Sequence, residues 1–66
     1  MALVAQKELE FLDELISAEM LAATKFNTYS QQCTDPQLKQ YLQQAAQAHQ
    51  RHYSTLMKHV DPRAAH

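Results

Sequence analysis

The sequence of 66 residues contains no glycine and only two prolines. An all-β sandwich or barrel needs turn residues at short intervals, and a phosphate-binding loop needs glycine, so the sequence excludes both. Alanine, glutamine, leucine, glutamate and lysine dominate the composition, and all five are good helix formers. We therefore expect an all-α protein, and the length allows one small domain, residues 1–66.

The helical pattern stops at only one place in the middle of the chain, the segment 33–36. Asp35 is a strong N-cap residue, because its carboxylate accepts hydrogen bonds from the free amides of the next helical turn. Pro36 then occupies the first helical position, where its missing N–H costs nothing. A second stop signal lies at Asp61-Pro62.

These signals predict one helix over residues 4–33, a second over residues 36–60 and a frayed tail at 61–66. A turn this short places consecutive helices antiparallel and side by side.

Each predicted helix carries a seam of residues spaced by threes and fours, which is the spacing of left-handed helix packing. The seam of the first helix consists of Leu12, Leu15, Glu19, Ala22, Phe26, Tyr29 and Cys33. The seam of the second consists of Leu38, Leu42, Ala45, His49, His52, Leu56 and His59. Further apolar residues flank both seams, among them Leu9, Phe11, Ile16, Met20, Ala23, Tyr41, Ala48, Tyr53 and Val60.

Apolar stripes of this width exceed what two helices can cover, so they predict a partner surface. A second copy related by a two-fold axis would bury them most simply, in a four-helix bundle. The expected partner is therefore another copy of this chain, and the expected assembly is a homodimer.

Net charge and hydropathy indicate which other classes of partner and which cellular compartment to expect. The net charge is −1 with a pI near 6.4, which argues against a non-specific nucleic-acid binder. No apolar run approaches the roughly 20 residues that span a bilayer, and the first residues lack the pattern of a signal peptide. The one cysteine, Cys33, allows no internal disulfide. We expect a cytoplasmic protein without a membrane or nucleic-acid partner.

Three seam residues are polar: Glu19, His49 and His52. If the hairpin is folded so that Cys33 faces Leu38, the numbers of any two facing residues add up to 71. Glu19 then lies opposite His52. His49 and His52 are three residues apart and point the same way on a helix. One carboxylate and two imidazoles should therefore converge at the middle of the bundle.

Three interpretations of this cluster remain open. It could bind a metal, because carboxylate oxygen and imidazole nitrogen suit zinc, iron or manganese. It could be a hydrogen-bonded Glu–His pair that fixes the register of the helices. Alternatively, the helices of the hairpin are rotated so that the histidines lie at its solvent-exposed edge. No catalytic set of side chains is found, so we expect no enzyme.

Several motifs in order resemble the Coat F family of endospore-forming bacteria, over residues 12–57. These motifs are Asp13-Glu14-Leu15-Ile16-Ser17-Ala18-Glu19, Phe26-Asn27-Thr28-Tyr29 and Cys33-Thr34-Asp35-Pro36-Gln37-Leu38.

The resemblance implies a ferritin-like helical protein of the spore coat or of the sporulating cell, with a structural role and other coat proteins as partners. Glu19 and His49 match positions at which ferritin-like proteins place metal ligands. Ala46 departs from that pattern, because a Glu-x-x-His pair would have glutamate there. The chain is also short, so a complete ferritin-like site would have to form between chains.

Overall fold

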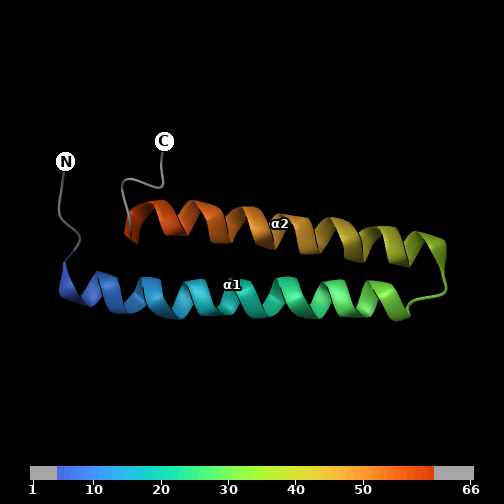
Figure 1. The fold of residues 1–66 in the computed structure, drawn as a ribbon, viewed down its shortest axis with the longest axis horizontal. Helices are drawn as coiled ribbons and strands as arrows, with labels where there is room; N and C mark the ends of the chain where they lie inside the picture. Colours follow the sequence, from blue (N-terminus) through green and yellow to red (C-terminus); the bar gives the residue numbers. More distant parts are fainter. Residues whose placement is uncertain (1–4, 61–66) are drawn as a thin grey trace.

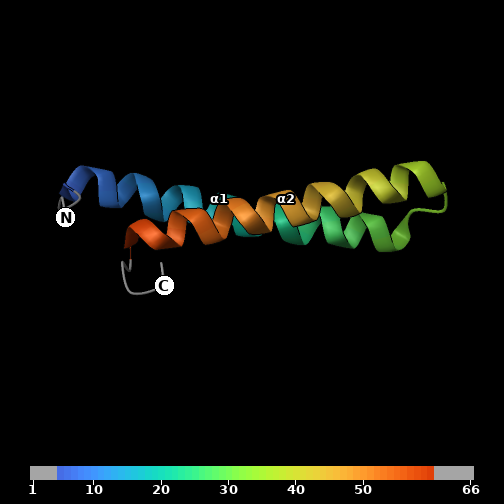
Figure 2. The ribbon, with the colours of Figure 1, turned by 90° about the horizontal axis from the view of Figure 1, so that it is seen from above.

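The computed structural model describes residues 5–60, which form two antiparallel helices, α1 (Gln6–Gln32) and α2 (Pro36–Val60) (Figure 1). Seen from above, the helices cross at a shallow angle (Figure 2). The Cα atoms extend over 46 Å along the long axis and 12 Å along the shortest, so the hairpin is a single layer of helices. The described part of the chain contains no strand, which confirms the all-α prediction.

The first helix begins at Gln6, two residues later than predicted, and the second spans the predicted residues 36–60. The predicted frayed tail, 61–66, lies outside the described residues. Neither helix is long and apolar enough to cross a membrane.

The turn between the helices is fixed by Asp35, as the sequence predicts. Its carboxylate oxygen Oδ1 accepts a 2.7 Å hydrogen bond from the backbone N–H of Leu38, the third residue of α2. Its carbonyl oxygen accepts the first helical hydrogen bond, from the N–H of Lys39 at 2.9 Å. These bonds pair the free N–H of Leu38 and the carbonyl oxygen of the cap residue Asp35, so α2 begins sharply at Pro36.

The helices meet through small side chains. Ala23 and Ala46 are the buried apolar residues of the described chain, and Ser30 is the buried polar one. The Ser30 hydroxyl donates a 2.7 Å hydrogen bond to the carbonyl oxygen of Asn27 in its own helix, so its burial leaves no polar group unpaired. Small side chains at these positions let the two backbones approach closely.

This contact differs from the predicted seam. Three seam residues, Leu15, Tyr29 and Leu38, are half exposed. Ala23 and Ser30 lie one position beyond the seam residues Ala22 and Tyr29, and Ala46 lies one position beyond Ala45, so each helix is rotated relative to the prediction. The seam is therefore turned toward one side of the hairpin, while seam residues such as Leu12, Phe26 and Leu42 stay partly buried.

Asp35→Ala should lower the free energy of unfolding by about 1 kcal/mol per chain, because the N–H of Leu38 loses its acceptor. Thermal melting followed by circular dichroism checks this, with unchanged helix content at low temperature. Asp35→Asn keeps an oxygen acceptor and should retain most of the stability. Equal melting temperatures for Asp35→Ala and the unaltered protein would contradict the assignment of the cap.

Candidate metal centre

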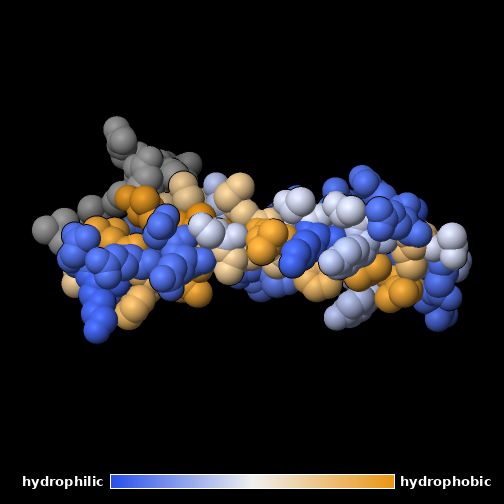
Figure 3. Space-filling model, turned by 90° about the horizontal axis from the view of Figure 1, so that it is seen from below, coloured by the Kyte–Doolittle hydropathy of each residue, from blue (hydrophilic) through white to orange (hydrophobic). Residues whose placement is uncertain are grey.

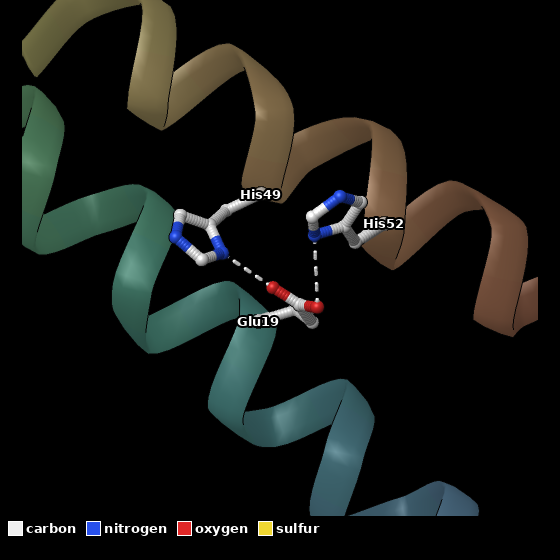
Figure 4. Close-up of side chains that lie close together, drawn as sticks. All are labelled: Glu19, His49 and His52. Atoms are coloured by element: carbon white, nitrogen blue, oxygen red, sulfur yellow. Dashed lines mark hydrogen bonds and ion pairs between the residues drawn. The ribbon is translucent and has the colours of Figure 1, made fainter. Parts of the chain in front are cut away.

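Glu19 of α1 lies between His49 and His52 of α2, as Figure 4 shows. The Nδ1 atom of His49 is 2.5 Å from Oε1 of Glu19. The Nδ1 atom of His52 is 3.2 Å from Oε2 of the same carboxylate. Since a carboxylate can only accept hydrogen bonds, each imidazole donates from a protonated Nδ1 in this arrangement.

The helices position these side chains by their registration. Glu19 is the middle residue of α1, and His49 and His52 lie at and just beyond the middle of α2. One helical turn separates the two histidines, so both rings reach one carboxylate on the opposite helix. The predicted pairing of Glu19 with His52 is confirmed, and the same carboxylate also bonds His49.

Aromatic contacts hold the imidazole of His49. The ring of Phe26 stacks on it, with centroids 5.3 Å apart and planes 5° from parallel. The ring of His52 contacts the ring of His49 edge-on, with centroids 5.6 Å apart and planes at 84° to each other. The sequence pattern marks Phe26 only as an apolar seam residue. The signal for its contact was its position seven residues after Glu19, which places both on the same face of α1.

The three side chains differ in exposure. The exposed fraction is 21% for Glu19, 29% for His49 and 58% for His52. The hydrogen bond from His49 holds the pKa of the Glu19 carboxyl below its ordinary value, partial burial opposes this effect, and the charge of a protonated His52 adds to it. The cluster therefore has a semi-buried side at Glu19 and His49 and an open side at His52.

Such an arrangement has two chemical uses. As described, the carboxylate accepts one hydrogen bond from each imidazole, and the group fixes the register of α1 against α2. The same donors, two imidazole nitrogens and one carboxylate oxygen, also form a ligand set for a divalent transition-metal ion. The predicted convergence of these three residues within one hairpin is confirmed, and a complete ferritin-like site between chains stays a prediction.

The lowered pKa of Glu19 predicts a pH dependence of stability. Because the folded carboxyl binds its proton more weakly than the unfolded one, its contribution is full above pH 4.5, the ordinary glutamate value, and is lost as pH falls through the lower folded pKa. We expect the stability difference between the unaltered protein and Glu19→Gln to shrink over that window.

Urea unfolding of both proteins at a series of pH values, at one chain concentration and with chelator present, measures this difference. Glu14→Gln, on the same helix and outside the cluster, is the control for a general charge effect. A Glu19→Gln difference that is constant from pH 6 to pH 3 would refute the prediction.

Comparison with known proteins gives one relative. The chain matches no family model and no solved structure, so the resemblance to Coat F proteins stays a prediction. It is 31% identical over 61 residues to the uncharacterized protein YuzM of Bacillus subtilis (strain 168), in an alignment that covers 92% of this chain and 75% of YuzM. The chain therefore belongs to the same protein family as YuzM.

Proposed function

We propose that the chain is a small structural protein that self-associates through one side of its hairpin, as a two-fold pair that forms a four-helix bundle. The supporting observation is an apolar face of large side chains that are each at least half exposed. We define this apolar face by Phe11, Leu15, Tyr29, Leu38 and Tyr41.

Helical spacing places these residues on one side of the hairpin. On α1, Phe11 and Leu15 are four residues apart, and Tyr29 follows Leu15 by fourteen residues, close to four turns. On α2, Leu38 and Tyr41 are three residues apart. A shallow groove joins the helices at the open end of the hairpin, lined by Phe11, Leu12, Leu15 and Leu56 with Glu8 and His59. In Figure 3, hydrophobic side chains reach the surface along the length of the hairpin.

Energetics favour covering this face. The described hairpin buries two alanines and one serine, which is a very small core for an independent domain. Each large side chain of the apolar face contributes roughly 1.5–3 kcal/mol when it is fully removed from water. Association therefore offers apolar burial that the contact between α1 and α2 does not supply.

Charge points to a second copy as the occupant. Helix α1 carries five acidic and two basic residues, a formal charge of −3, and α2 carries Lys39, Arg51 and Lys58, a charge of +3 with neutral histidines. Within residues 5–60, no Lys or Arg pairs with an Asp or Glu. A two-fold pairing that lays α1 of each copy on α2 of the other places opposite charges next to each other.

The biological setting we propose is the spore coat or the cytoplasm of the sporulating cell, where other coat proteins would bind the assembly. This setting is supported by the Coat F resemblance alone. Imaging of a fluorescent fusion in sporulating cells tests it: signal at the forespore surface supports the coat, and signal confined to vegetative cells contradicts both settings.

Self-association predicts a species of twice the chain mass, 7.6 kDa per chain, in sedimentation equilibrium at micromolar concentration. The melting temperature should rise with protein concentration, because unfolding then releases separate chains. A folded monomer whose melting temperature is independent of concentration would overturn the proposal.

A matched pair of leucines tests which face associates. Leu15 lies on the apolar face and is 51% exposed, and Leu21 is 56% exposed on the same helix, six residues later and so about 120° around the axis. Leu15→Gln should weaken dimerisation by at least about a hundredfold, because two copies of the substitution are buried per dimer. Leu21→Gln should leave the dissociation constant unchanged. Equal effects of the two substitutions would place the interface elsewhere.

A further inference from the structure

We propose that Glu19, His49 and His52 bind one divalent transition-metal ion per chain, with Zn²⁺ as the representative ion. The ion would cross-link α1 to α2 at the middle of the hairpin. One chain supplies all three ligands, so this site does not depend on self-association.

The distances are close to those of a metal site. One donor atom from each residue can be chosen such that all three lie within 4.8 Å of one another. Ligand atoms around a tetrahedral zinc ion, at bond lengths of 2.0–2.2 Å, lie about 3.4 Å apart. The Nδ1 atoms are already 2.5 and 3.2 Å from the carboxylate oxygens. Admitting an ion therefore requires the longest of these separations to shorten by at most about 1.4 Å and the His49–Glu19 pair to open by about 0.9 Å.

His52 is the ligand that must rotate to complete the site, and it is also the least constrained of the three side chains. Phe26 stacks on His49 and holds its ring with Nδ1 toward Glu19, so this half of the site is preorganised. His52 is more than half exposed, and no stacked ring constrains it. Rotation of His52 can therefore complete the ligand set without displacing either helix.

The imidazole nitrogens can exchange their hydrogen bonds to Glu19 for bonds to a metal ion without losing a proton. Without an ion, Nδ1 of each imidazole faces an oxygen of Glu19, and a proton on Nδ1 fits this arrangement. A shift of that proton to Nε2 leaves the imidazole neutral and frees the Nδ1 lone pair for the ion. The ionised carboxylate then binds the ion in place of two N–H donors.

The donor set selects the class of ion. Two imidazole nitrogens with one carboxylate oxygen suit zinc and its first-row neighbours, whereas Mg²⁺ and Ca²⁺ prefer sites made of oxygen. Three protein ligands leave at least one coordination position for water or another ligand, as in open zinc sites. The exposure of His52 places this position on the open side of the cluster.

The test uses full-length protein without a histidine tag, stripped with chelator and dialysed against Zn²⁺ or Mg²⁺ at equal concentration. We expect one Zn²⁺ per chain by elemental analysis, a melting temperature that rises with Zn²⁺ concentration, and no change with Mg²⁺. Co²⁺ in place of Zn²⁺ should give visible absorption bands of a low-coordinate site. Absence of bound Zn²⁺ and unchanged melting at tens of micromolar ion would overturn the proposal and leave the cluster as a hydrogen-bonded register device.

Variants locate the site. His52→Ala and Glu19→Gln should each weaken Zn²⁺ binding by at least about a hundredfold, since the loss of a ligand exceeds the 10–100-fold cost of losing a supporting residue. His59→Ala is the matched control, because His59 lies seven residues after His52 on the same face of α2 and outside the cluster. It should keep one Zn²⁺ per chain.

His52 is exposed and its removal leaves the Glu19–His49 bond, so His52→Ala should keep its helix content and isolate ion binding from folding. Binding that survives in His52→Ala, or that is lost in His59→Ala, would refute the assigned ligands. Sedimentation of the same samples reports the dimer separately, so failure of either proposal is recognised without the other.

Discussion

Two helices packed side by side can cover only one strip of each other, and every other property of this hairpin depends on that limit. Its most buried residues are alanine and serine, so the backbones approach closely, while large apolar residues such as Leu15 and Tyr41 stay at least half exposed. In a single-chain four-helix bundle, a third and a fourth helix cover such residues. Here the described part of the chain has no further element, and several large apolar side chains stay half exposed.

The polar cluster can lie between the two helices because its carboxylate is paired with both imidazoles. A carboxylate removed from water without partners is costly, but Glu19 accepts from both imidazoles and keeps a fifth of its surface exposed. No buried side-chain nitrogen or oxygen among the described residues lacks a partner. The carboxylate spans one turn of α2, so sliding the helices by a turn would break one bond or both.

The sequence contains enough information to predict the helices, their antiparallel order and the meeting of Glu19 with the histidines. Asp35 and Pro36 define the start of α2 through local backbone chemistry, and a tight turn then fixes the register of distant residues. The rotation of each helix about its axis was not predictable in the same way. Seam and flanking positions are both apolar, and the choice between them depends on small side chains such as Ala23 and Ala46, whose advantage appears only when two backbones meet.

The central position of the cluster has a consequence for how copies align. A two-fold axis through the middle of the apolar face would bring the cluster of one chain next to that of the other. Seven residues to either side of Glu19 and His49 the sequence is apolar, at Leu12, Phe26, Leu42 and Leu56. A pairing that slips by one heptad, about 10 Å, would press each charged carboxylate against the partner's hydrocarbon surface. In the proposed pair, the cluster would therefore disfavour an alignment that slips by one heptad.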